Sequence, residues 1–376
     1  MMRLHVRLFL LMLCFLMLVS CSSAQLVKEA ASHKLSIKEK EEISVSFFTN
    51  KTIIPNQSEG QSFHGVVDWY DNDSVLYLGQ EGSFSNIYTY DLFSGKSNLF
   101  YSSEHLISEV SSNESNTLFA VQSVQTNQKT LLQILDREGE EFFRWDGYVD
   151  RVQVMWHPLK DKELILSVLE KDWTFSVLHV NIVTGNLTPI DVDNPFVQWV
   201  DNDHIAYLNW YQDEQSFTAP VIITDVNSME VEHTLQDFFA IFSFPHYLLG
   251  LSSIGPSHDL AQFTFYDSMT LNEIVQMTVP VLQTYSEQQW IPNYSFDSHN
   301  EIFYYFRPIH SGNISKYDND FELTSFSLRD QEEKVIHVSE RNVPLKVSPD
   351  GSLCIVGDRL ENVIIFESGQ LVPLFM

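Results

Sequence analysis

The feature that most constrains the fold of this chain is a repeated strand-and-turn pattern. Short runs of apolar and aromatic residues end in a polar residue, most often an acid or an amide, and a turn follows. Five clear copies and two weaker ones occur: Ile87–Asp91, Leu131–Asp136, Val177–Asn181, Val221–Asp225, Gln262–Asp267, and then Leu323–Ser327 and Val363–Glu367. Their last residues are separated by 45, 45, 44, 42, 60 and 40 positions. Repetition at about 40–45 residues, with short strands in each unit, is typical of a β-propeller.

Each repeat divides into four candidate strands, which we name A to D in chain order. In the first repeat they are Gly65–Asp71, Val75–Gly79, Asn86–Asp91 and Ser97–Tyr101. Val, Ile, Phe, Tyr and Thr fill the strands, Asp, Asn, Ser and Gly fill the gaps, and no long amphipathic helix is evident. We count seven such repeats between about residue 63 and the end of the chain. The sequence therefore predicts an all-β fold, a seven-bladed β-propeller, with six blades as the alternative.

The turns between strands A and B are rich in Asp, Asn, Pro and Gly. Trp199–Asp203 repeats the pattern of Trp69–Asp73, and the same place in other repeats is filled by Pro158–Asp161, Asp297–Asn300 and Ser348–Gly351. Asx side chains bond the backbone in tight turns and Gly adopts positive φ there, so we interpret these turns as structural. They lack the longer ordered set of carboxylates that an EF-hand calcium loop needs, so we predict no metal site.

The N-terminus has the organisation of a secretory signal. Arg3 and Arg7 precede the apolar run Leu8–Val19, which is shorter than the ~20 residues that a membrane-spanning helix needs. The stretch Leu18–Cys21 resembles the bacterial lipobox, in which the cysteine is lipidated and becomes the mature N-terminus. We therefore predict lipid attachment at Cys21, with a plain transmembrane anchor and a signal cleaved without lipidation as the alternatives.

This interpretation sets the domain organisation. We predict a signal peptide over residues 1–20, a lipidated N-terminus and flexible tether over residues 21–42, and the β-propeller over residues 43–376. Because each buried CH₂ contributes ~0.8 kcal/mol to membrane anchoring, attached lipid would hold the chain at the extracytoplasmic face of the cell membrane.

The mature chain is strongly acidic. The full sequence has 22 Lys and Arg against 50 Asp and Glu, and loss of Arg3 and Arg7 leaves 20 against 50, a formal charge of −30. Such a surface repels nucleic acid and suits cationic partners. Cys354 is the one cysteine outside the signal and the lipobox, and its apolar neighbours predict a buried structural thiol.

The lipobox and the repeats together resemble the YqgU-like β-propeller lipoproteins of Gram-positive bacteria. The resemblance covers nearly the whole chain and rests on architecture and the lipobox, not on a catalytic motif. That family is described as six-bladed, the alternative to our count of seven. The turn Ser348–Gly351, with the sequence Ser-Pro-Asp-Gly, is also similar to turns of TolB-type propellers, which are assembly and binding modules.

No catalytic motif is present in the sequence. G-x-S-x-G, H-E-x-x-H, C-x-x-C, the P-loop and the Rossmann glycine pattern are all missing. We therefore predict no catalytic residues, no metal and no cofactor.

The predicted ligand face is the one formed by the B–C and D–A loops, which propellers commonly use. Four of the seven arginines of the mature chain map there, beside the long B–C insertion Asn209–Thr218. The candidate residues are Arg151, Trp210, Tyr211, Arg307, Arg341 and Arg359. Arginine pairs with carboxylates or phosphates, and aromatic faces stack on sugars or peptides. The alternative is that each arginine pairs with a neighbouring acid of this chain, namely Asp150, Asp318, Glu340 or Asp358.

These observations predict a lipid-anchored binding or assembly module without catalytic activity. Its partner would be a protein, peptide or glycan of unknown identity, with no nucleic acid involved, and we expect a monomer. The alternative is an extracytoplasmic propeller enzyme, a hydrolase or lyase that acts on polysaccharide or peptide, because propellers host such enzymes too.

Overall fold

The computed structural model describes residues 52–56, 62–210, 216–255, 259–284 and 290–375. The chain divides into two compact units, Met1–Thr52 and Ile53–Met376, and the second holds all the described strands. The predicted signal peptide, Cys21 and the tether lie outside the described residues, and so does Tyr211.

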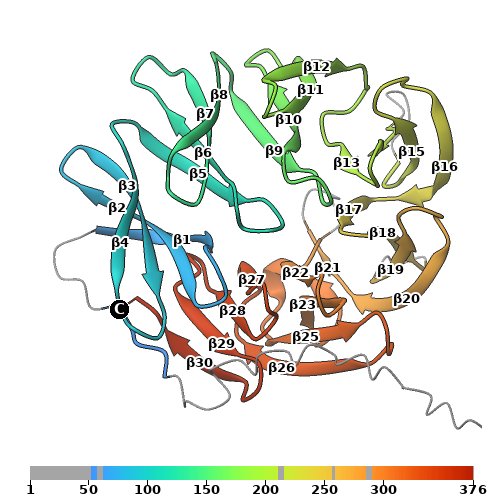
Figure 1. Ribbon diagram of the computed structural model, residues 1–376. Helices are drawn as coiled ribbons and strands as arrows, with labels where there is room; N and C mark the ends of the chain where they lie inside the picture. Colours follow the sequence, from blue (N-terminus) through green and yellow to red (C-terminus); the bar gives the residue numbers. More distant parts are fainter. Residues whose placement is uncertain (1–51, 57–61, 211–215, 256–258, 285–289, 376) are drawn as a thin grey trace, which may run out of the picture. The chain divides into compact units, whose positions relative to one another are not determined.

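Seven four-stranded antiparallel sheets follow one another along the second unit, and we call each sheet a blade (Figure 1). Blades 1 to 4 are β1 (Ser62–Trp69), β2 (Ser74–Glu81), β3 (Phe84–Asp91) and β4 (Ser97–Ser103); β5 (Leu106–Ser112), β6 (Phe119–Val124), β7 (Thr130–Leu135) and β8 (Glu141–Gly147); β9 (Arg151–Trp156), β10 (Glu163–Leu169), β11 (Phe175–Asn181) and β12 (Asn186–Ile190); β13 (Gln198–Trp199), β14 (His204–Leu208), β15 (Ala219–Asp225) and β16 (Val231–Phe238).

Blades 5 to 7 continue the same order. They are β17 (Ala240–Phe244), β18 (Tyr247–Ile254), β19 (Leu260–Asp267) and β20 (Glu273–Pro280); β22 (Tyr294–Asp297), β23 (Ile302–Pro308), β25 (Phe321–Ser327) and β26 (Glu333–Ser339); β27 (Leu345–Val347), β28 (Leu353–Val356), β29 (Asn362–Ile365) and β30 (Gln370–Pro373). The predicted all-β propeller with seven repeats is therefore confirmed.

The blades form a ring with each first strand innermost and each fourth strand outermost, as Figure 1 shows. The middle strands of a blade are largely buried because neighbouring blades cover both of their faces, and β7, the third strand of blade 2, is buried along its whole length. Outer strands face solvent on one side and alternate: in β20, Val275, Met277 and Val279 are buried while the residues between them are exposed. Cys354 is fully buried on β28, as predicted, and this burial raises the pKa of its thiol.

The ring closes between blades 7 and 1 without a shared sheet. Each of these blades comes from one continuous segment, and residues from both ends of the unit join them. Asn56 pairs with Phe375 in a parallel bridge, and the ring of Phe375 stacks on Phe63 with centroids 4.0 Å apart. The indole N–H of Trp69 donates to the carbonyl of Lys346 at 3.0 Å. Closure protects strand edges that would otherwise pair with other chains.

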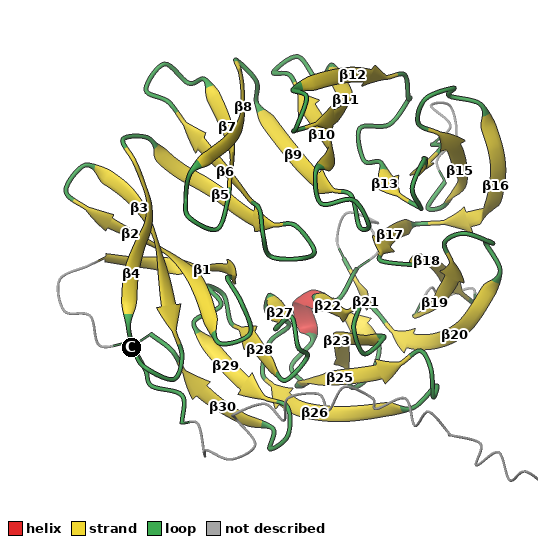
Figure 2. Ribbon diagram, viewed as in Figure 1, coloured by secondary structure: helices red, strands yellow, loops and turns green. Residues whose placement is uncertain are grey.

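The ring has two different ends. We call the end with the A–B turns the turn face and the end with the B–C and D–A loops the loop face. The loop face carries the longer connections: β21 (Leu282–Gln283) pairs in parallel with β24 (Gly312–Asn313), and the short helix η2 (Ile314–Lys316) follows. This insertion lies within the longest repeat interval. Figure 2 shows η2 as the helical element, and no helix among the described residues has the length and apolar character needed to cross a membrane.

Candidate functional site

The structure places the predicted ligand residues at the loop end of their blades. Arg151 begins β9, Arg307 lies near the end of β23, Trp210 is in the β14–β15 loop, and Arg341 and Arg359 are in the loops that flank β27 and β28. The mapping of these residues to one face therefore agrees with the strand topology, apart from Tyr211, which is outside the described residues.

Two of these arginines are paired with acids of the chain itself. The guanidinium of Arg307 lies 3.3 Å from Glu333, and that of Arg341 lies 2.7 Å from Asp358. Arg341 thus pairs with one of the four acids that the sequence offered as alternative partners, whereas Arg307 pairs with Glu333, which was not among them. An anion-binding patch on this face stays a prediction.

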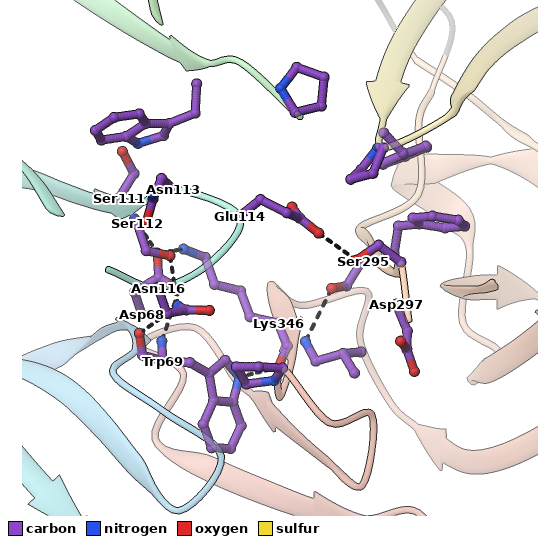
Figure 3. Close-up of a pocket in the computed structure, with 18 of the residues that line it drawn as sticks. Asp68, Trp69, Ser111, Ser112, Asn113, Glu114, Asn116, Ser295, Asp297 and Lys346 are labelled. Carbon is purple, nitrogen blue, oxygen red and sulfur yellow. Dashed lines mark hydrogen bonds and ion pairs between the residues drawn. The ribbon is translucent and has the colours of Figure 1, made fainter. Parts of the chain in front are cut away.

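A cavity of about 450 Å³ lies at the other end of the ring, on the turn face. Residues at or after the ends of the inner strands of blades 1, 2, 3, 5, 6 and 7 line it (Figure 3). Its volume is within the range of small-molecule sites, ~300–1,000 Å³. The sequence interpretation treated these turns as structural and missed this site.

One wall of the cavity contains an ion pair between Lys346 of blade 7 and Asp68 of blade 1, and Asp68 also bonds blade 2. The ammonium of Lys346 donates to Asp68 at 2.8 Å and to the carbonyl of Val67 at 3.0 Å. Asp68 also accepts the backbone N–H groups of Trp69 and Ser112, each at 2.9 Å. Both charges are therefore fixed by partners within the protein.

His157 lies in the cavity wall as a neutral, structural histidine. Its Nδ1 accepts the backbone N–H groups of Leu159 and Lys160, both at 3.0 Å, so this nitrogen carries no proton. Its Nε2 then donates to the carbonyl of Asn202 at 3.3 Å. Burial lowers the pKa of the imidazole, which agrees with the neutral form.

Glu114 bridges the channel. It belongs to the β5–β6 turn, and its carboxyl accepts the hydroxyl of Ser298, after β22, at 2.5 Å. Blades 2 and 6 are as far apart as two blades of a seven-membered ring can be. In Figure 3 the side chain reaches from the side of Asn113 and Asn116 towards Ser295 and Asp297.

The environment of Glu114 raises the pKa of its carboxyl group. The residue as a whole reaches solvent, but burial of the carboxyl group raises its pKa. The bond from Ser298 opposes this rise, while the nearby carboxylates of Asp297 and Asp161 add to it.

Three tryptophans end inner strands, and one of them differs from the others. The indole N–H of Trp69 donates to Lys346, and that of Trp199 donates to the carbonyl of Met155 at 3.4 Å. The indole nitrogen of Trp156, which lines the cavity, is buried without a hydrogen-bond partner in the described chain, and so is the hydroxyl of Ser243. The cavity wall therefore has unused hydrogen-bonding capacity. Tryptophan at the same place in three repeats was the sequence signal that could have pointed here.

No group of three or more His, Cys, Asp or Glu side chains in the described part of the chain is arranged to hold a metal ion.

Comparison with known proteins decides the family. The family model described as "YqgU-like 6-bladed beta propeller domain" matches residues 91–357. The chain belongs to the YqgU-like β-propeller family. The matched segment runs from the end of β3 to just after β28, so it holds five complete blades and parts of blades 1 and 7. The structure itself has seven four-stranded blades, although the family description counts six.

Two similar proteins are both called uncharacterised. The chain is 23% identical over 371 residues to the uncharacterised lipoprotein YqgU of Bacillus subtilis, covering 96% of this chain and 97% of the relative. A crystal structure of the uncharacterised protein lmo1340 from Listeria monocytogenes matches with a TM-score of 0.79 and 17% identity, over 87% of this chain and 98% of that chain.

TolB from Acinetobacter baumannii also matches, over 59% of this chain and 55% of that chain. The TM-score is 0.39 and the identity is 14%, so the similarity to TolB-type propellers carries no argument about function.

Proposed function

We propose that this chain is a lipid-anchored, extracytoplasmic binding protein whose turn-face cavity takes a small, neutral, hydroxyl-rich ligand such as a carbohydrate. The lipobox at Leu18–Cys21 and the lipoprotein name of the Bacillus subtilis relative support the anchor. The cavity and its chemistry support the binding role.

The observation that carries the proposal is that each carboxylate of the cavity, together with its lysine and its histidine, already has a partner in the fold. Asp68 and Lys346 hold each other, His157 is bonded to backbone, Glu114 is bonded to Ser298, and Asp297 accepts the backbone and amide N–H groups of Asn300 at 2.9 and 2.7 Å. Catalysis by acyl or glycosyl transfer needs a nucleophile or general base free to reach the substrate. Groups engaged in this way favour binding over turnover.

The remaining wall chemistry indicates the ligand class. Serine hydroxyls can donate and accept, aromatic rings can stack on the apolar faces of sugar rings, and the acids outnumber the one lysine. The residues that provide these groups are Ser111, Ser112, Ser243, Ser295 and Ser298, and Trp156, Phe244, Tyr294 and Phe296. An anion would meet a wall with more carboxyl groups than cations, whereas a neutral polyol meets both donors and acceptors.

The test is ligand-observed NMR on the full-length protein with glucose, N-acetylglucosamine and their disaccharides, with galacturonate and inorganic phosphate as anionic comparisons. We expect saturation transfer to a neutral sugar and none to the anions. Ser111→Phe, which fills the cavity, should abolish it. Ser108→Phe, on the solvent-exposed side of the same strand, is the matched control and should leave it intact. The proposal would be contradicted if no neutral sugar showed saturation transfer, or if Ser111→Phe and Ser108→Phe reduced the transfer equally.

A second function is favoured by Glu114, namely that of a hydrolase or lyase acting on polysaccharide or peptide. A carboxyl whose pKa is raised by burial can serve as a general acid. Glu114→Gln separates the two functions. A binding protein keeps its affinity for the sugar within a few-fold because the amide still bonds Ser298, whereas an enzyme loses turnover of the bound saccharide. Turnover by the wild type that Glu114→Gln abolishes would replace the binding proposal.

A further inference from the structure

Exposed aromatic side chains concentrate on the loop face, away from the cavity. Seven aromatic residues are exposed in the described chain, and five of them lie on the loops of blades 2, 3 and 4. Trp173 is 90% exposed and Tyr148 is 65% exposed. We call the following set the aromatic surface: Leu106, Val124, Tyr148, Trp173, Phe196, Trp210 and Phe217. Large exposed apolar patches mark interaction sites.

Hydrogen bonds show that the loops of the aromatic surface are neighbours. Lys171, beside Trp173, donates to Gln128 in the loop of blade 2 at 3.3 Å. In the same loop of blade 2, Asn127 reaches the hydroxyl of Tyr148 at 3.4 Å.

The contacts continue into blade 4. The hydroxyl of Ser167, on β10, donates to the carbonyl of Pro195 at 2.5 Å, next to Phe196. Asn194 donates to the carbonyl of Leu208 at 2.8 Å, at the start of the loop that holds Trp210. These bonds join the loops of blades 2, 3 and 4 that carry the aromatic surface.

Trp173 occupies a backbone position that its residue type does not favour. Its φ is +70°, in the left-handed region that is costly for bulky side chains. The B–C loop of blade 2 has the same backbone hydrogen bonds. In blade 2 the N–H of Gln125 donates to the carbonyl of Lys129, and the N–H of Gln128 donates to the carbonyl of Gln125. In blade 3 the N–H of Glu170 donates to the carbonyl of Thr174, and the N–H of Trp173 donates to the carbonyl of Glu170. Gln128 has a φ of +64°. The turn thus forms with a polar residue, and the indole of Trp173 is not needed to build it.

The charges around the aromatic surface indicate the partner. Six acids flank it against three bases: Asp146, Asp150, Glu170, Asp172, Asp191 and Asp193, with Lys129, Arg151 and Lys171. Carboxylates mixed with aromatic faces bind lysine and arginine side chains through ion pairs and cation–π contacts. The same acids oppose contact with anionic lipid headgroups.

We propose that the aromatic surface docks a basic, partly apolar segment of an extracytoplasmic protein, with Trp173 as the central anchor. Buried tryptophans surrounded by polar rims dominate the affinity of many protein interfaces. This docking is independent of the cavity ligand, because the two sites lie on opposite faces of the ring.

The test measures the affinity of the full-length protein for a lysine–leucine repeat peptide and for a glutamate–leucine peptide of equal length. We expect the basic peptide to bind, more weakly at high salt, and the acidic peptide not to bind. Trp173→Gln, which copies the residue at Gln128, should keep the melting temperature and weaken binding about tenfold or more. Leu99→Gln removes an exposed apolar side chain on the outer strand β4 and should change nothing.

Further arms of the experiment separate the competing explanations. Ser111→Phe should leave the affinity for the basic peptide unchanged. The docking proposal and the cavity proposal can therefore fail independently of each other. Equal effects of Trp173→Gln and Leu99→Gln, or binding of the acidic peptide, would overturn the proposal. Flotation of the protein, without its lipid, on anionic vesicles in a Trp173-dependent manner would overturn it in favour of a membrane surface.

Discussion

The turn face and the loop face are built by the same repeats, but different interactions hold them. On the turn face, side chains cross from blade to blade: Trp69 bonds Lys346, and Glu114 bonds Ser298 across the channel. On the loop face, aromatic side chains such as Trp173 project into solvent and ion pairs such as Arg341–Asp358 are exposed. We infer from this difference that the A–B turns hold the blades together and shape a cavity, while the loop face presents a docking surface.

The largest expected difference between the faces concerns two glycines. Gly351 has a φ of +71°, and a Cβ there would collide with the carboxylate of Asp297 and the amide of Asn300. Gly82, on the loop face, has a φ of +61° with open space around it. We expect Gly351→Ala to destabilise the protein by about 3 kcal/mol and Gly82→Ala by about 1 kcal/mol. Urea unfolding of both variants measures this, and equal costs would remove the contrast between the faces.

Ion pairs give the next contrast. Asp68 is nearly buried, so Lys346→Met should cost about 2 kcal/mol by leaving its carboxylate without a cation. Arg341 and Asp358 are mostly exposed, and Arg341→Met should cost less than about 0.5 kcal/mol. Denaturant midpoints of the two variants test the order, and a larger loss at Arg341 would show that the loop face also fixes the ring.

Within the turn face, we expect substitutions of Trp69 and Trp156 to differ in their effect on stability. Trp69→Phe removes an N–H and leaves the Lys346 carbonyl without its donor, so we expect a loss of about 1 kcal/mol. Trp156→Phe removes an N–H that has no partner in the described chain, so stability should stay the same or rise slightly. A clear loss at Trp156 would mean that its N–H already has a partner, such as an ordered water.

The smallest effect concerns pH and His204, which follows an A–B turn on the turn face. Burial lowers the pKa of this imidazole, but the carboxylates of Asp201 and Glu232, at 2.8 and 3.1 Å, outweigh burial and raise it overall. The charged form is thus favoured in the folded state. Its stabilisation, at most about 1 kcal/mol, is complete below the unfolded pKa of ~6.5 and is lost as pH rises through the folded pKa.

His204→Gln tests this sign. The melting temperature of the variant should fall below that of the wild type near pH 5 and converge with it near pH 9. A gap that widens with pH would show that the imidazole acts while neutral.

The fold could be predicted in detail from the sequence because strands and turns depend on residues close together in the chain. Alternating apolar runs and Asx or Gly turns are set by neighbours a few residues apart, so the four strands of the first repeat were predicted within three residues of their observed bounds.

The candidate site was harder to predict because it is not local. Glu114 and Ser298 are 184 residues apart, and their contact depends on the radius of the closed ring. The same holds for the aromatic surface: Trp210 was predicted from its loop, but Trp173 and Tyr148 were not, since their exposure is set by the packing of adjacent blades.

Hydrogen–deuterium exchange of the full-length protein, with and without the neutral sugar that gives the strongest NMR response, tests the division between the two faces most directly. We expect protection of the turns at residues 113–118 and 294–298, and none in the loops at residues 125–129 and 170–174. Protection on the loop face, or no protection in the turns, would contradict it.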